Sequence, residues 1–146
     1  ALELLRVSGE VAEREGSKIV SIEHIDLAED KIEKERVVDV IITQPRQTQL
    51  TLYTIILSNP QPKQIIFTGE VYELYKKLCY KINLRPLTMR RLSDIIAELD
   101  MLGIISTRTI SKGRYGRTRE IGLAVPDYLK ANIKKVLEDA LEIQNE

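Results

Sequence analysis

The helix pattern that opens residues 88–125 constrains the fold more than any other feature of this sequence. Thr88 stands before the pattern as a candidate N-cap, and Gly103 follows it where a left-handed C-terminal cap is expected. Between them, apolar side chains recur at helical spacing, at Leu92, Ile95, Ile96, Leu99 and Leu102. The sequence therefore predicts an amphipathic helix over residues 88–102 with both ends marked.

A β-hairpin is predicted directly after this helix. Residues 104–111 and 118–125 are rich in isoleucine, threonine and valine, which favour strands. They flank a turn that contains Gly113 and Gly116, a pattern typical of hairpins. A helix that leads straight into a hairpin is how a winged helix ends.

Basic side chains gather on this segment although the whole chain is neutral. The chain has 22 basic and 22 acidic residues, whereas residues 48–126 have 12 basic and 6 acidic ones, a net charge of 12 − 6 = +6. A basic field confined to one region is typical of nucleic-acid binding. On a helical wheel Arg90 lies opposite the apolar face, so we expect it to face solvent or a groove. The basic residues from position 85 to 119 are Arg85, Arg90, Arg91, Arg108, Lys112, Arg114, Arg117 and Arg119.

Further helices are predicted on both sides of this segment. Residues 1–15 have a helical pattern that Gly16 ends, and a long helix then begins at the candidate cap Ser21 and stops near Pro45. A strongly apolar helix over residues 47–58 is expected to be the first helix of the winged helix. Thr68 is a candidate cap for the next helix, and a last helix begins after Pro126. We therefore expect a mainly α fold with a small β-hairpin (α+β), a winged helix-turn-helix preceded by two helices and followed by a C-terminal helix.

Motifs for catalysis are missing from the sequence. It has no Gly-x-x-x-x-Gly-Lys-Ser/Thr loop, no GxGxxG after a strand, no GxSxG and no HExxH. We expect the only histidine, His24, to be an ordinary surface or helix-start residue, and the only cysteine, Cys79, to be buried. Without a Cys/His cluster, no metal site is expected. The sequence thus predicts neither catalytic nor cofactor-binding residues.

The same sequence predicts a protein of the cytoplasm, associated with the nucleoid. No apolar run approaches the roughly 20 residues that span a bilayer. No signal-peptide pattern opens the chain, and a lone cysteine fits a reducing compartment.

The hairpin tip, residues 111–118, has two interpretations. One is a solvent-exposed loop that needs glycines for its turn, but this does not explain Tyr115 between arginines. The other is a DNA contact, because cations beside a flat ring on a turn can enter a minor groove and contact phosphates. Arg90 and Arg91 in the first helical turn suit phosphate or major-groove contacts, although an internal ion pair competes for Arg91. The predicted DNA-binding residues are Thr88, Arg90, Arg91, Lys112, Gly113, Arg114, Tyr115, Gly116, Arg117 and Arg119.

Three segments carry a resemblance to a known family. They are ALELLRVSGEVAE at residues 1–13, LTMRRLSDIIAELDMLGII at 87–105 and SKGRYGRTREI at 111–121. These segments resemble the C-terminal part of the archaeal replication initiators, which are related to the eukaryotic origin recognition complex and its cell-division-control loader. The resemblance extends over residues 1–125.

This resemblance implies a parent AAA+ ATPase with a nucleotide-binding domain, a helical lid and a winged-helix domain that binds origin DNA. Residues 1–43 would be the end of the lid and the connecting helix, and residues 44–146 the DNA-binding domain. In relatives, the helix matching residues 88–102 enters the major groove and the hairpin matching 112–117 reaches the minor groove. ATP and Mg²⁺ are implied for the intact parent, but the motifs that bind them lie upstream of the matching region. No cofactor is therefore expected in this chain.

Double-stranded origin DNA is the expected partner, with the replicative helicase and other initiator paralogues as further candidates and a monomer as the expected state. Two alternatives stay open from the sequence. A winged-helix transcription regulator would use its terminal helices as a dimer interface, which light scattering would detect. A protein-interaction module that contacts the helicase would bind a protein but show no affinity for a duplex.

Overall fold

The computed structural model describes residues 2–16, 22–59, 65–111, 113 and 117–143. The chain divides into two compact units, Ala1–Val40 and Ile41–Glu146. Each unit is described by itself below. The predicted division into residues 1–43 and 44–146 stays a prediction about the parent's domains.

The first unit contains helix α1 (Leu2–Arg14) and most of helix α2 (Ile22–Ile42). Within this unit His24 is only 6% exposed, and its Nε2 lies 2.6 Å from a carboxylate oxygen of Glu15. Of the two places expected for His24, a surface or a helix start, the helix start is confirmed, since His24 lies in the first turn of α2, and the surface position is wrong. The reason is tertiary: the start of α2 packs close to the end of α1, and burial of an imidazole is tolerated when a polar partner satisfies it. The predicted cap Ser21 lies outside the described residues.

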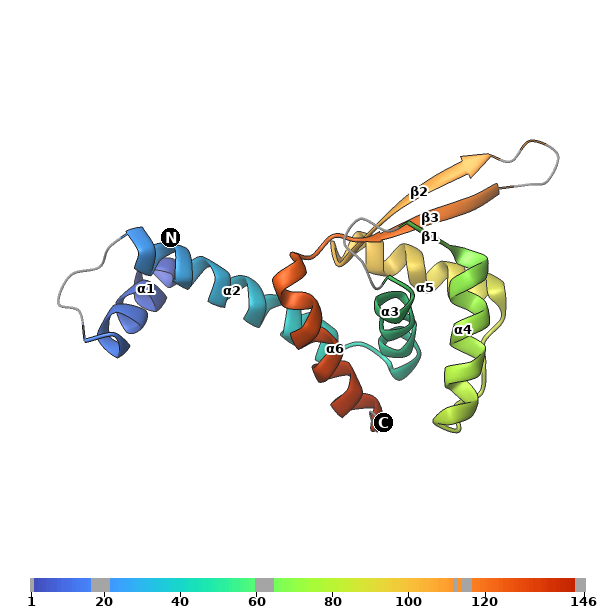
Figure 1. Ribbon diagram of the computed structural model, residues 1–146, viewed down its shortest axis with the longest axis horizontal. Helices are drawn as coiled ribbons and strands as arrows, with labels where there is room; N and C mark the ends of the chain where they lie inside the picture. The colour runs from blue at the N-terminus through green and yellow to red at the C-terminus, as the bar shows by residue number, and fades with distance from the viewer. Residues whose placement is uncertain (1, 17–21, 60–64, 112, 114–116, 144–146) are drawn as a thin grey trace. The chain divides into compact units, whose positions relative to one another are not determined.

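The second unit contains the remaining elements in the order expected of a winged helix (Figure 1). The helices and strands are α3 (Arg46–Ser58), β1 (Ile66–Phe67), α4 (Thr68–Lys81), α5 (Met89–Met101), β2 (Ile105–Ser111), β3 (Arg117–Leu123) and α6 (Asp127–Leu141). The mainly helical fold with a small sheet is confirmed. The helix predicted over residues 88–102 is also confirmed, as α5 with Thr88 before it and Leu102 after it.

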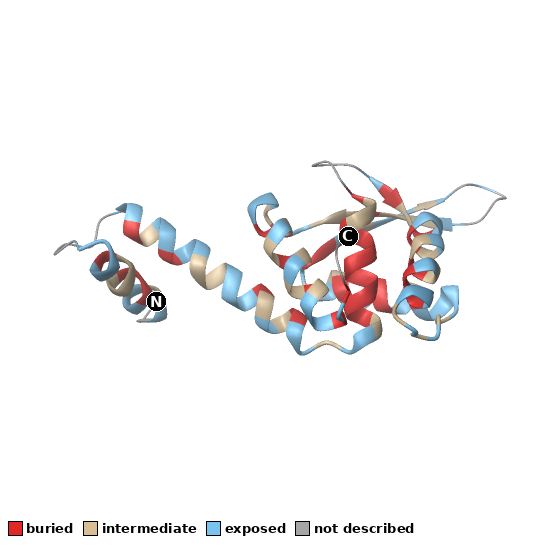
Figure 2. Ribbon diagram, turned by 60° about the horizontal axis from the view of Figure 1, so that its bottom comes forward, coloured by how far each residue is buried: buried red, intermediate tan, exposed pale blue. Residues whose placement is uncertain are grey.

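Helix α3 forms the centre of this unit. Every residue from Thr48 to Ile56 is buried, and α4, α5, α6 and β3 all pack on the helix (Figure 2). Two threonine hydroxyls on α3 are satisfied by carbonyls one turn earlier in the helix. Thr51 donates to Gln47 at 2.8 Å, and Thr54 donates to Leu50 at 2.7 Å. A helix buried on all sides is a core element rather than a surface one.

The sheet has three strands rather than the two of the predicted hairpin. β1 pairs antiparallel with β3, with Ile66 opposite Ile121, and the strand order is β1-β3-β2. A two-residue strand is too short to show alternation in a sequence, so periodicity could not reveal it. Thr68 follows β1 directly and is the first residue of α4, whose N-cap is Phe67. The prediction that Thr68 caps this helix is therefore wrong.

A hydrogen-bond network around Tyr75 fixes the connection between α4 and α5. The Tyr75 hydroxyl donates to Oε1 of Gln47 on α3 and accepts from the backbone N–H of Leu87 at 3.0 Å. Gln47 in turn donates to the carbonyl of Arg85 at 2.9 Å, and the hydroxyl of Tyr72 donates to the carbonyl of Leu87 at 3.0 Å. Side chains from two helices thus satisfy the turn just before the cap of α5, which sets where α5 begins.

Helix α6 closes the other side of α3. The helix predicted after Pro126 is confirmed, and its buried stripe consists of Leu129, Ile133, Leu137 and Leu141. The hydroxyl of Tyr53 on α3 donates to a carboxylate oxygen of Glu138 on α6 at 3.0 Å. Burial, with a smaller contribution from Glu138, raises the pKa of Tyr53 to about 12.

We predict that Tyr75→Phe lowers the free energy of unfolding by about 1–3 kcal/mol, because the part-buried N–H of Leu87 loses its acceptor. Tyr80→Phe on the same helix is the control, since Tyr80 is 75% exposed and should change stability by less than about 0.5 kcal/mol. Urea unfolding of both variants checks this. Equal midpoints for the two variants would contradict the role assigned to the network.

We also predict that the stability of the wild type falls more steeply with pH between 10 and 12 than that of Tyr53→Phe. Because the pKa of Tyr53 in the folded state is raised above its unfolded value of about 10, its contribution to stability is fully present below pH 10. It is lost as the pH rises toward 12, where the folded phenol ionises beside Glu138. Urea unfolding at several pH values measures the two slopes, and parallel slopes would contradict the prediction.

Candidate nucleic-acid interface

Helix α5 exposes the cations at its N-terminus because its apolar side is fixed by burial. Its residues Leu92, Ile95, Ile96 and Leu99 face the core. The Thr88 hydroxyl accepts a hydrogen bond from the backbone N–H of Arg91 at 3.3 Å, as predicted for an N-cap. Arg90 and Arg91 are both exposed in the first turn, so the expected orientation of Arg90 is confirmed. These guanidinium groups add to the partial positive charge of the helix N-terminus.

The hairpin is a regular antiparallel ladder from Ile105 opposite Leu123 to Ser111 opposite Arg117. Gly113 is exposed with a φ of +62°, a left-handed conformation that glycine adopts without strain. Of the predicted tip residues, Lys112, Arg114, Tyr115 and Gly116 lie outside the described residues.

The two arginines of β3 differ in what they contact. Arg119 is half-buried, and its guanidinium donates to the backbone carbonyl of Ser93 on α5 at 3.0 Å. Arg117 is exposed at the end of the strand. Residues two apart in a strand share a face. Arg119 therefore ties the sheet to α5, while Arg117 on the same face is available to a ligand.

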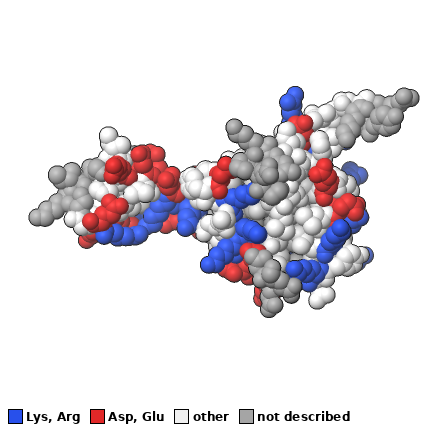
Figure 3. Space-filling view, in the orientation of Figure 1, with Lys and Arg blue, Asp and Glu red and all other residues white. Residues whose placement is uncertain are grey.

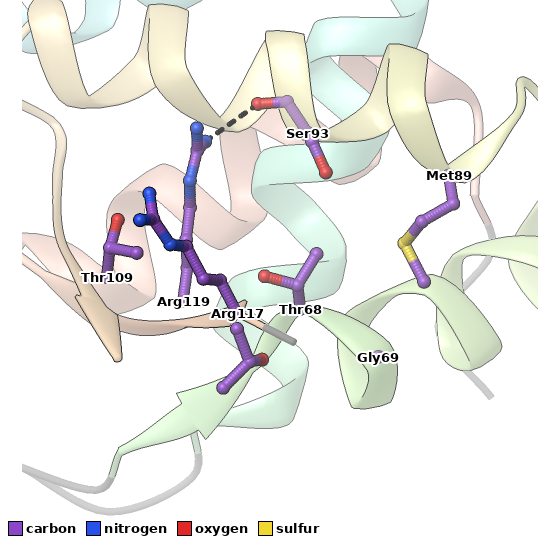
Figure 4. A pocket seen from close by; sticks show the side chains of 8 residues that line it. Thr68, Gly69, Met89, Ser93, Thr109, Arg117 and Arg119 are labelled. Atoms are coloured by element: carbon purple, nitrogen blue, oxygen red, sulfur yellow. Dashed lines mark hydrogen bonds between the residues drawn. The ribbon is translucent and has the colours of Figure 1, made fainter. Parts of the chain in front are cut away.

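A hollow of about 530 Å³ lies where β3, α5 and the start of α4 meet. Arg117 and Arg119 line it from the sheet, Ser93 from α5, and Thr68 and Gly69 from α4 (Figure 4). In the close view the Thr68 hydroxyl is turned toward the two arginine side chains. Sequence analysis missed this site, because Thr68 and Ser93 carry no charge and lie far from β3 along the chain.

Charges of both signs are mixed over the face drawn in Figure 3. Among the described residues, however, ion pairs with carboxylates are absent from four exposed arginines, Arg90, Arg91, Arg108 and Arg117. The predicted competition for Arg91 by an internal ion pair is therefore not seen. Their guanidinium groups are therefore not neutralised by carboxylates of the described chain and can interact with an external anion.

Other reactive groups do not gather near this surface. Cys79 is fully buried as predicted, and burial raises the pKa of its thiol. In the residues that the structure covers, no three His, Cys, Asp or Glu side chains are placed to hold a metal ion. Nor does this part of the chain contain a helix long and apolar enough to cross a membrane.

We predict that Arg119→Ala lowers the free energy of unfolding by about 1 kcal/mol, since one charge-assisted hydrogen bond between β3 and α5 is lost at a half-exposed site. Arg108→Ala, an exposed arginine on β2, is the matched control and should leave stability nearly unchanged. Urea unfolding measures both, and an Arg119→Ala variant as stable as its control would show that the bond does not hold the two elements together.

Comparison with known proteins identifies the fold. Residues 39–129 match the family model of the CDC6 C-terminal winged-helix domain. The chain is 51% identical over 139 residues to the ORC1-type DNA replication protein 1 of Methanosarcina acetivorans. The aligned residues are 94% of this chain and 33% of that protein. It is 50% identical over 133 residues to the ORC1-type DNA replication protein of Pyrococcus horikoshii, and the aligned residues are 91% of this chain and 32% of that protein. The chain thus spans about one third of the length of these relatives.

Solved structures agree. The Aeropyrum pernix ORC1 protein, solved in complex with DNA, superposes with a TM-score of 0.83 at 43% identity, covering 94% of this chain and 35% of that one. Cdc6p from Pyrobaculum aerophilum shares the fold with a TM-score of 0.56 at 24% identity, covering 96% and 36%. The resemblance to archaeal replication initiators is confirmed, and the chain belongs to the family of the Cdc6 C-terminal winged-helix domain.

Proposed function

We propose that this chain binds double-stranded DNA at a replication origin, with α5 in the major groove and the β2–β3 hairpin in the adjacent minor groove. One observation carries the proposal. Two elements of one fold expose arginines that no carboxylate of the described chain neutralises, at the N-terminus of α5 and at the outer end of β3. The relative that is 43% identical was solved in complex with DNA, which supports the same partner here.

The first turn of α5 suits a duplex for two physical reasons. A helix fits the width of the major groove, and its N-terminus attracts phosphates through free N–H groups and the helix dipole. Arg90 and Arg91 add full positive charges at this end. Asp94 and Glu98 are exposed further along the helix and repel phosphates. The favourable contact is therefore limited to the first turn, and Arg90 is the residue we assign to base contacts.

The hairpin supplies a second grip on the DNA. Arg117 stands at its outer end, and the sequence places Lys112, Arg114 and Tyr115 beyond it. Arginines enter narrow minor grooves because the negative potential there is enhanced. Because the hydrogen bond from Arg119 to Ser93 joins the hairpin to α5, the two DNA-contacting elements would keep a fixed spacing.

For the longer parent protein, binding of ATP and Mg²⁺ and contact with a replicative helicase or other initiators stay predictions. So do the monomeric state of this chain and its place in the cytoplasm. The family assignment favours an initiator over a transcription regulator.

We predict that Arg114→Ala/Arg117→Ala weakens duplex binding at least tenfold at low salt, to a similar extent for different sequences, whereas Arg90→Ala also changes sequence preference. With six cations at phosphates, log K against log salt should have a slope of about −5, reduced by about 2 in the double variant. Fluorescence anisotropy of a labelled duplex at several salt concentrations measures both quantities.

The charge-matched control is Lys34→Ala/Lys135→Ala, which removes two exposed cations from α2 and α6 and should keep the wild-type slope. A wild-type affinity that does not change with salt, or equal losses in both double variants, would exclude the proposed interface.

A further inference from the structure

The hollow between β3, α5 and α4 contains an unsatisfied polar group. Thr68 is only 9% exposed, and its hydroxyl oxygen is buried without a hydrogen-bond partner among the described residues. Leaving a buried hydroxyl unpaired is unfavourable by about 1–3 kcal/mol. Such a group calls for an explanation, and a ligand that completes the site is one. Its orientation toward Arg117 and Arg119 indicates what kind of ligand this is (Figure 4).

The start of α4 adds donors to the same place. No side chain caps this helix, so the N–H groups of its first turn are not satisfied by a cap. A Cβ built on Gly69 would meet nothing within 4 Å, so the backbone there is open to an approaching group. Glu70, the one acid of this turn, is exposed and does not line the hollow. The surroundings are therefore those of an anion site at a helix N-terminus.

The arginines make the site cationic without an internal counter-ion. Arg117 forms no ion pair within the described part of the chain. Arg119 uses one guanidinium nitrogen for the Ser93 carbonyl, and a guanidinium has five N–H donors. Both side chains line the hollow, whose volume of about 530 Å³ exceeds what a tetrahedral oxyanion and a few water molecules need.

We propose that this hollow is a subsite for one phosphate group, held by the Arg117 guanidinium, the first N–H groups of α4 and the Thr68 hydroxyl, with Arg119 as a positioning residue. The proposal rests on the proposed function, in which this group is a phosphodiester of the DNA backbone between the two grooves. A tetrahedral anion with several acceptor oxygens fits donors that converge from two elements, β3 and α4, better than a planar carboxylate does.

Thr68→Val tests the proposal, because it removes the hydroxyl and keeps the shape of the side chain. If the hydroxyl serves only the ligand, the variant should be as stable as the wild type or more stable, yet bind a duplex about fivefold more weakly. The control is Thr51→Val on α3, where the hydroxyl already has a partner, and duplex affinity should not change. Thr68→Val with unchanged duplex affinity would overturn the assignment of this hydroxyl to the phosphate.

A duplex scanned with single neutral methylphosphonates locates the phosphate. We expect one position at which neutralisation weakens wild-type binding about fivefold or more, and at which the further loss caused by Arg117→Ala or Thr68→Val disappears. Losses that add at every position would show that the hollow holds no backbone phosphate and would overturn the proposal.

Titration with inorganic phosphate separates this proposal from the proposed function. If the wild type does not bind a duplex, the proposed function fails. The subsite then stands only if phosphate shifts the NMR signal of the Gly69 amide in the wild type and not in Arg117→Ala. If the wild type binds DNA and phosphate shifts the Gly69 amide signal, but no methylphosphonate position cancels the effect of the variants, the hollow binds free phosphate only. That outcome would overturn the assignment of the hollow to a DNA backbone phosphate. Without a shift and without a coupled position the subsite itself is overturned.

Discussion

The burial of every residue from Thr48 to Ile56 in α3 is the constraint on which the rest of the second unit depends. A helix with no side toward water needs partners all around it, and α4, α5, α6 and β3 supply them. The hydroxyls of Thr51 and Thr54 inside it donate to carbonyls of the helix itself, and the buried side-chain polar atoms without a partner in the described chain, on Asn59 and Thr68, lie outside α3. Because α5 must turn its apolar stripe toward α3, its arginines face outward. The exposure of Arg90 and Arg91 is thus a consequence of packing.

Polar contacts, rather than the apolar core, set the positions of α5 and β3 relative to their neighbours. The Tyr75 hydroxyl links α3, α4 and the residue before Thr88, and the Arg119 guanidinium links β3 to α5. Hydrogen bonds are directional, whereas apolar burial is not, so these few bonds fix where α5 begins and how β3 lies beside it. The proposed contact with two DNA grooves would need such a fixed spacing, because a shift between the two contacts would lose one of them.

Binding and stability make opposite demands at the hollow between β3, α5 and the start of α4. Thr68 leaves a hydroxyl unpaired in a buried place, and two arginines of like charge line one hollow. Both features are unfavourable in the free protein and would become favourable with a phosphate in the proposed subsite. Arg117 and Arg119 share a chemistry and a strand face, yet only Arg119 reaches a carbonyl of α5. One arginine therefore stabilises the fold and the other remains available for binding.

Much of this protein was determined by local sequence. The α5 helix with its Thr88 cap, the two long strands, the buried stripe of α6 and the winged-helix order all follow from periodicity, caps and strand-forming residues, which act between near neighbours. The exposure of Arg90 could be predicted because a helix has a fixed angular period. The resemblance to initiators depended on short segments that the sequence displays directly.

Only the tertiary structure decided the remainder. The strand β1, the burial of His24 and the failure of Thr68 to act as a cap each depend on what packs against a residue from elsewhere in the chain. The hollow brings Thr68, Ser93 and Arg117 together from three elements, and no spacing in the sequence reports a distance across such a gap. Local interactions set which segments are helices and strands, but the hollow lies between elements, and its position is a property of their packing.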